Sequence, residues 1–157
     1  MKPLPAEGGF YIETYRSQQR IPALLLPPGH KADRSLATAI LYLLTPETFS
    51  ALHKIKSDEI YHFYLGDPVT MLQLYPDGAT RCVTVGSDVL AGQRPQVVAP
   101  KNTLQGCFLN EGGTFALMGT TVAPGFEFDD LEFPDTQKLL DQYPDRRQMI
   151  MRLTRRG

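Results

Sequence analysis

A chain of 157 residues is the size of one common domain, and such a domain buries about 70% of the surface that its unfolded form exposes. Its 42% apolar and 21% charged residues are typical of a globular protein, but 13 Gly and 13 Pro are more than a helical bundle tolerates. The net charge of −1 gives no long-range field to attract nucleic acid or an acidic membrane, so neither is expected as a partner.

The first eight residues hold one Lys, two Pro and no apolar core, which is unlike a signal peptide. The longest apolar runs, 24–26 and 37–44, fall far short of the roughly 20 residues that cross a bilayer. We therefore expect a cytoplasmic protein. Cys82 and Cys107 have no CxxC spacing, so two buried, reduced thiols are expected.

Short runs rich in aromatic and β-branched residues alternate with turn residues along most of the chain, which predicts many strands and a single domain over 1–157. The segment 37–45 is apolar on both faces and is expected at the centre of a sheet. Turns at 66–68 and 76–78 are expected to join neighbouring strands as meander hairpins. The expected strands are 9–17, 37–45, two within 59–75, one ending at 85, 96–99, 106–109 and 115–122.

Only the end of the chain, about 135–155, has helical signals. Asp135 can cap a short helix that carries Leu139 and Leu140, and Pro144 can open another that carries Ile150. These helices are expected to cover a barrel, which gives an all-β fold of the jelly-roll kind with short C-terminal helices. The arginines near the end are expected at a solvated helix end, with an anion or RNA contact as the alternative; they are Arg146, Arg147, Arg152, Arg155 and Arg156.

The segment from His53 to Gly66 carries the most chemical information. If Glu59 points inward, the two-residue period of a strand places Tyr61 and Phe63 on the same inner face, with His62 on the outer face. A turn at 56–58 would fold the preceding strand back, so that His53 and Glu59 meet across a hairpin. When an imidazole lies beside a carboxyl group, the pKa of the imidazole rises and the pKa of the carboxyl group falls. This coupling is what a general base requires.

The spacing of His53, Glu59 and Gly66 resembles the first motif of the cupin superfamily, in which two His in HxH spacing precede the Glu. Ile55 stands where the second His would be. In the segment similar to the second cupin motif, Gln105 stands where the family has its last His. Two of the four metal ligands that the family implies are therefore kept, one becomes an amide and one is lost.

A closer resemblance is to a subfamily of small cupins called cupin type 5. It rests on the segments 7–11, 13–17, 53–66 and 122–130, with 96–105 between them. The resemblance implies a double-stranded β-helix barrel and a homodimer in which the N-terminal strand, about 8–17, is exchanged. It brings no established reaction. An aromatic strand at 10–15 would also leave an adhesive edge in a monomer, which favours the same homodimer.

The leading interpretation is a small-molecule-binding cupin that acts as a metal-independent isomerase or epimerase on a carbohydrate or nucleotide-sugar-like ligand. His53 would be the base, Glu59 would orient it and Tyr61 would be the acid, by analogy with sugar-nucleotide epimerases of the same fold. The expected substrate-binding side chains are Arg16, which could clamp an anion or pair with Glu13, together with Phe63 and Gln105.

Two alternatives remain open. One is a metal-dependent oxygenase or lyase in which His53, Glu59 and Gln105 supply one nitrogen and two oxygen ligands; this set is weak, so no cofactor is expected. The other is a non-catalytic ligand sensor. Asp129 and Asp130 resemble a paired-carboxylate site, but are expected to cap or solvate a surface loop.

Overall fold

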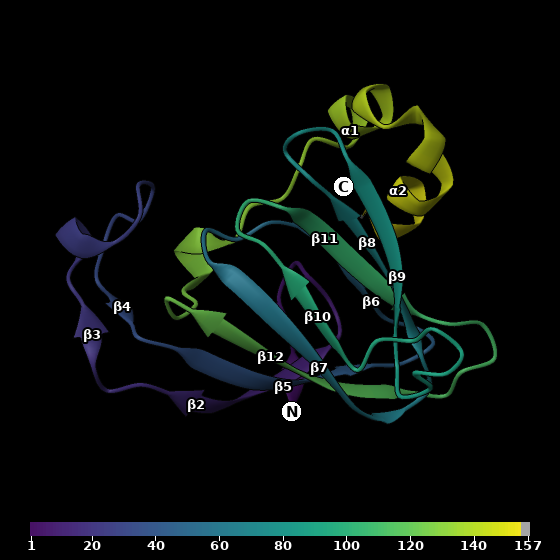
Figure 1. Ribbon diagram of the computed structural model, residues 1–157, viewed down its shortest axis with the longest axis horizontal. Helices are drawn as coiled ribbons and strands as arrows, with labels where there is room; N and C mark the ends of the chain where they lie inside the picture. Colours follow the sequence, from purple (N-terminus) through teal and green to yellow (C-terminus); the bar gives the residue numbers. More distant parts are fainter. Residues whose placement is uncertain (155–157) are drawn as a thin grey trace.

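Two antiparallel sheets face each other in the computed structural model, which describes residues 1–154 (Figure 1). The six-stranded sheet has the order β1 (Lys2–Pro3), β2 (Phe10–Arg16), β5 (Thr38–Leu44), β12 (Ala116–Ala123), β7 (Asp58–Gly66) and β10 (Gln96–Ala99). The four-stranded sheet has the order β6 (Phe49–His53), β11 (Leu104–Leu109), β8 (Val69–Leu74) and β9 (Thr80–Val85). The expected mainly-β jelly-roll architecture is confirmed.

The space between the sheets is filled from both inner faces. Tyr42 of β5, Tyr61 of β7, Met71 of β8 and Met118 of β12 are all buried in one apolar cluster. The expected alternation along β7 is confirmed, because Glu59 and Tyr61 are buried while Tyr64 is exposed. The segment expected at a sheet centre is β5, which lies between β2 and β12.

The meander expected around the turn at 66–68 is wrong. The chain leaves β7 in the six-stranded sheet and enters β8 in the other sheet, so the two strands are not paired. The turn is tied down by Asp67, whose Oδ2 accepts hydrogen bonds from the backbone N and the Oγ1 of Thr114. By contrast, β8 and β9 do form the expected hairpin around 76–78, with Val69 opposite Val85 and Leu74 opposite Thr80.

The hairpin expected to join His53 to Glu59 is also wrong. β6 ends at His53 and pairs with β11, whereas β7 begins at Asp58 and pairs with β12 and β10 in the opposite sheet. The strand period fixes which face a side chain occupies but leaves its partner strand open. His53 and Glu59 therefore approach each other across the interior of the barrel and not along one sheet.

The C-terminal helices are confirmed and pack on the outer face of the four-stranded sheet (Figure 1). They are α1 (Thr136–Gln142), the 3₁₀ turn η3 (Pro144–Arg146) and α2 (Arg147–Leu153). The Asp135 side chain accepts a hydrogen bond from Lys138 N at 3.1 Å, as expected for a cap. Leu140 and Ile150 are buried against Leu72.

Two of the terminal arginines contact other side chains of the protein. Arg146 Nε donates to Thr80 Oγ1 at 2.9 Å, and the Arg152 guanidinium lies 3.6 Å from the Phe108 ring centroid. Arg152 is nevertheless exposed in the last turn of α2, as expected for a solvated helix end, whereas Arg146 is half-buried; Arg155 and Arg156 lie outside the described residues.

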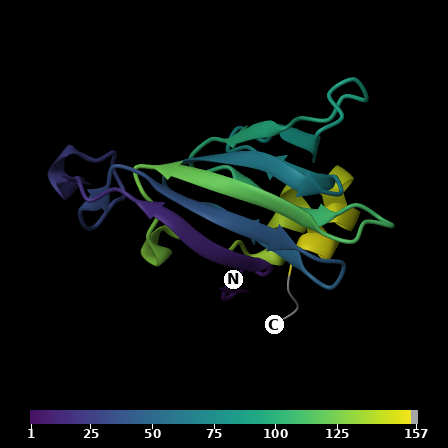
Figure 2. The ribbon, with the colours of Figure 1, turned by 90° about the horizontal axis from the view of Figure 1, so that it is seen from below.

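An arm extends beyond the barrel at the end of β2 (Figures 1 and 2). It contains β3 (Arg20–Ile21), the 3₁₀ turn η1 (Ala23–Leu25) and β4 (Arg34–Ser35). At its base, Arg34 Nε lies 2.7 Å from Asp130 Oδ2, and both side chains are only 3% exposed. Asp130 belongs to the 3₁₀ turn η2 (Phe128–Asp130), so the expectation that it solvates a surface loop is wrong.

Two smaller expectations can also be judged. Both cysteines are free, but only Cys107 is buried, whereas Cys82 is exposed. Within residues 1–154, the helices are too short and too polar to pass through a bilayer.

Candidate functional site

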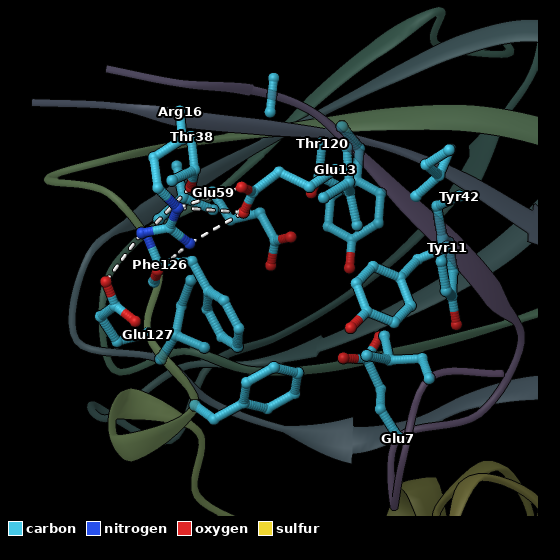
Figure 3. A pocket seen from close by; sticks show the side chains of 18 of the residues that line it. Glu7, Tyr11, Glu13, Arg16, Thr38, Tyr42, Glu59, Thr120, Phe126 and Glu127 are labelled. Carbon is cyan, nitrogen blue, oxygen red and sulfur yellow. Dashed lines mark hydrogen bonds and ion pairs between the residues drawn. The ribbon is translucent and has the colours of Figure 1, made fainter. Parts of the chain in front are cut away.

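A cavity of about 570 Å³ lies between the sheets at the end of the barrel beside η2 (Figure 3). Its walls come from β2, β5, β7 and β12 of the six-stranded sheet, from the end of β6, and from the segments before β2 and after β12. Of the residues expected at a site, His53, Glu59, Tyr61 and Arg16 line it. Phe63 and Gln105 do not.

His53 is buried at the end of β6 and presents one defined nitrogen to the cavity. Its Nδ1 lies 2.7 Å from Ala51 O, and because a carbonyl oxygen only accepts, Nδ1 carries the proton. Nε2 therefore holds the lone pair of the neutral ring. This nitrogen lies 3.8 Å from Glu7 Oε2, which also lines the cavity.

Glu59, at the start of β7, is the buried carboxyl group on the opposite sheet. Gln105 Nε2 donates to its Oε2 at 2.5 Å, so Gln105 holds Glu59 from behind and does not contact the cavity itself. Burial raises the pKa of Glu59 to about 7. A positive charge on His53 opposes this rise, and the negative charge of Glu7 adds to it. Such a group can give and take a proton near neutral pH.

Glu7 is a site residue that the strand pattern did not reveal. Its Oε1 accepts from Ser50 Oγ at 2.8 Å and its backbone O accepts from Ala51 N at 2.9 Å, so the segment before β2 is fastened to β6. Gly9 has φ of +68°, and a Cβ there would lie 2.7 Å from Tyr42 Oη, so the chain can turn here only with glycine. This turn aims Glu7 into the barrel.

Aromatic side chains form much of the remaining wall. Burial raises the pKa of Tyr61 well above its ordinary value, and the negative charges of Glu59 and Glu7 add to this, so its phenol stays protonated. Tyr11, Phe126 and Phe128 also line the cavity, the two Phe rings 5.2 Å apart. Phe63, expected in this wall, instead packs against the apolar cluster deeper in the barrel.

Arg16 lines the cavity and pairs with Glu13, which confirms the second of the two alternatives left open for it. Its Nη2 lies 2.8 Å from Glu13 Oε2, its Nη1 lies 2.7 Å from Glu127 Oε1, and Nη2 also donates to Phe126 O. Figure 3 shows these contacts as dashed lines on one side of the cavity, away from Glu7 and Tyr11. The guanidinium charge is thus already balanced by two carboxylates.

The side chains present do not fit the metal that the cupin motif implies. Within residues 1–154, no three His, Cys, Asp or Glu side chains are arranged to hold a metal ion. Ile55 presents an apolar side chain to the cavity, and the Gln105 amide is turned with its nitrogen toward Glu59. No step of the chemistry proposed below is therefore assigned to a metal.

A model of the cupin superfamily (DUF985) matches residues 1–134 of the sequence. The chain belongs to this cupin family. The uncharacterized protein YML079W from Saccharomyces cerevisiae is 31% identical over 136 residues, which cover 81% of this chain and 67% of that protein.

Solved structures agree with this membership. A hypothetical protein from Leishmania major is 28% identical, with a TM-score of 0.88 over 99% of this chain and 93% of that one. A protein from Shewanella oneidensis is 34% identical, with a TM-score of 0.81 over 96% of this chain and 89% of that one. These similarities establish the family and the fold but no reaction.

Proposed function

We propose that this cupin binds a small organic molecule in the barrel cavity and moves a proton on it, as a metal-independent isomerase or epimerase of a carbohydrate-like compound. One observation carries the proposal: the Nε2 lone pair of His53 is held at the cavity, opposite a carboxyl group, Glu59, whose pKa is raised to about 7. General acid–base catalysis works best with an acid whose pKa lies near the working pH, and Glu59 meets this requirement.

The proposed step is a proton transfer at a carbon next to a carbonyl group. His53 Nε2 removes the proton from that carbon, the electron pair moves onto the carbonyl oxygen, and the protonated form of Glu59 donates a proton to that oxygen. The Glu59 carboxylate then takes the proton from the hydroxyl group on the first carbon, whose oxygen becomes the new carbonyl, while His53 delivers its proton to the former carbonyl carbon. This gives the isomer and restores both groups. Tyr61 stays neutral, so it can donate a hydrogen bond to the same oxygen.

Of the two ligand types expected, a free sugar suits the cavity better than a nucleotide sugar. A diphosphate needs several cations that are not already paired. Arg16 is balanced by Glu13 and Glu127. This leaves Lys2, whose Nζ lies over the Tyr11 ring, as the other permanent cation that lines the cavity. Hydroxyl groups of a sugar can instead bond to the carboxylates, and its carbon faces can stack on aromatic rings such as Tyr11 and Phe126.

The test is solvent deuterium incorporation into a panel of aldoses and ketoses in D₂O, followed by proton NMR. We expect exchange at one carbon with the native protein and a loss of at least about 100-fold in rate for His53→Gln. His62→Gln is the matched control, because His62 lies on the outer face of β7 and contacts Thr121 and Gln96. Equal exchange by His53→Gln and the native protein would refute the proposal.

Binding without turnover is the second candidate function. It is favoured by the hydrogen bond from Gln105 to Glu59, which already occupies one oxygen of the carboxyl group that would act as acid. Native mass spectrometry that finds an organic mass retained by the native protein, with no deuterium exchange over the whole panel, would support this candidate over the isomerase.

A further inference from the structure

Negatively charged side chains outnumber cations around the cavity. The acids are Glu7, Glu13, Glu59 and Glu127, whereas the permanent cations are Lys2 and Arg16. These acids come from β2, from β7, from the segment before β2 and from the segment after β12, so a ligand that enters this cavity meets carboxylates from several parts of its wall.

The four acids fall into two pairs with different surroundings. The outer pair, Glu13 and Glu127, is partly exposed and shares the guanidinium of Arg16. The inner pair, Glu7 and Glu59, is buried, with exposures of 8% and 7%. Arg16 therefore balances the outer pair and contributes no contact to the inner pair.

No Lys or Arg forms an ion pair with the inner pair in the part of the chain that the structure describes. The cations Lys54 and Lys56 pair with Glu132 and Asp130, outside the cavity. The basic groups that line the cavity besides Arg16 are His53, whose Nε2 lies 3.8 Å from Glu7, and Lys2, whose Nζ lies 5.3 Å from the centroid of the Tyr11 ring. Above pH 7, where Glu59 is ionised, two buried carboxylates beside one imidazole leave a negative charge uncompensated even when the imidazole is protonated, and an unpaired buried charge is costly.

The walls around the inner pair suit an organic cation better than a bare metal ion. Aromatic faces attract ammonium groups and pack against carbon skeletons, and the rings of Tyr11, Tyr42 and Tyr61 line the cavity; the ammonium group of Lys2 already lies over the Tyr11 ring. An ammonium group offers three N–H donors, and Glu7 and Glu59 offer carboxylate oxygens on two sides of the cavity.

We infer that the cavity recognises a primary amine, with its ammonium group seated between Glu7 and Glu59 and its carbon skeleton against the aromatic wall. This inference rests on the proposed function only in that a small molecule enters the cavity. It narrows the substrate class to amino compounds such as amino sugars. It also excludes phosphorylated and carboxylated ligands, which the inner pair would repel.

The test uses three probes of one shape and different charge: benzylamine, benzyl alcohol and benzoate. Titrations at pH 8, followed by saturation-transfer NMR, give the dissociation constant of each. We expect benzylamine to bind at least about tenfold more tightly than benzyl alcohol, since a charge-assisted hydrogen bond contributes that much, and benzoate not to bind. Glucosamine is expected to displace benzylamine more effectively than glucose does.

Isosteric variants locate the ammonium group. Glu7→Gln and Glu59→Gln should each weaken benzylamine binding by about tenfold and leave benzyl alcohol unchanged. Glu132→Gln, an exposed carboxylate paired with Lys54, is the matched control and should change neither. If one inner variant fails to fold by circular dichroism, the other still tests the assignment.

Benzyl alcohol binding as tightly as benzylamine, or no binding of benzylamine, would overturn the inference. The proposed proton transfer would survive either result, because the deuterium exchange of neutral sugars judges it separately. Loss of deuterium exchange in His53→Gln together with equal binding of the charged and neutral probes would leave an isomerase without amine selectivity.

Discussion

Glu59 is a buried carboxyl group with one amide donor, and its environment sets a pH dependence for the whole protein. The pKa of Glu59 is about 7 in the folded state, against 4.5 for an ordinary glutamate. Burial is the main cause, and Glu7 contributes in the same direction. Groups facing it from the surrounding strands are His53 on β6, Gln105 on β11 and Thr120 on β12.

We expect the free energy of unfolding to fall as the pH rises from 4.5 to 7. In this window the folded protein holds a proton on Glu59 that the unfolded chain has lost, so the contribution of Glu59 is fully present below pH 4.5 and is lost above pH 7. The loss is on the order of 3 kcal/mol. Urea denaturation at several pH values measures it, and Glu59→Gln should flatten this part of the profile.

The control for this prediction is Glu132→Gln, which removes an exposed carboxylate and should keep the native slope. An unchanged slope in Glu59→Gln would show that another group titrates in this range.

The Arg34–Asp130 ion pair joins the base of the arm to η2. This turn carries Phe128, which belongs to the cavity wall. Both oxygens of Asp130 are used, since Arg34 Nε and Nη2 donate to Oδ2 and Oδ1 at 2.7 and 2.8 Å. The interactions of the aspartate with Arg34 hold the pKa of Asp130 below its usual range, although burial opposes this. The pair thereby fixes one wall of the cavity relative to β4.

We expect Asp130→Asn to lower the free energy of unfolding by about 3–5 kcal/mol, because it leaves the Arg34 guanidinium buried without its partner. The comparison is Glu132→Gln, whose pair with Lys54 has side chains 39% and 50% exposed and should contribute about 0–1 kcal/mol. Urea denaturation of both variants tests this, and similar small losses would contradict it.

The sequence predicted the strands better than it predicted their pairing. Alternation placed Glu59 and Tyr61 inward, and turn residues marked where strands end. The sequence did not reveal that the chain passes from one sheet to the other at the turn 66–68, because the two-residue period carries no information about the neighbouring strand. His53 and Glu59 were expected to meet along a hairpin, but they lie on strands of opposite sheets and line one cavity.

The same limit explains which site residues were missed. Glu7 lies in a segment without strand periodicity, and its direction depends on the positive φ at Gly9 and on the bond to Ser50, which join residues far apart in sequence. The family resemblance did include Glu7 and Glu127 in its motifs, so it marked the segments but gave the side chains no role. Phe63 was expected in the wall because it shares the face of Tyr61, but the cavity ends before it.

For the whole molecule, we propose a homodimer formed at the free edge of β2. β1 pairs only with Phe10 and Tyr11, and beyond them Ile12 and Tyr15 are 45% and 55% exposed. A strand edge with exposed apolar side chains favours pairing with another chain. Since β2 also supplies cavity residues such as Arg16, a second subunit at this edge would lie beside the site.

We expect light scattering after size exclusion to give twice the mass of one chain, and Tyr15→Lys to give a monomer, because a buried lysine at the interface is costly. The matched control is Val98→Lys on β10, the opposite edge of the same sheet, where Val98 is 44% exposed. Dissociation by Val98→Lys with no effect of Tyr15→Lys would place the interface at the other edge.

The four-stranded sheet separates two apolar clusters that share almost no side chains. Along β8, Met71 faces the barrel interior and its neighbour Leu72 faces α1 and α2. Substitutions among the helices can therefore alter thermal tolerance without reshaping the cavity. Thermal stability can therefore be raised by substitutions in the helical layer, and ligand selectivity can be changed by substitutions on the opposite side of the sheet. The two sets of substitutions can be screened independently.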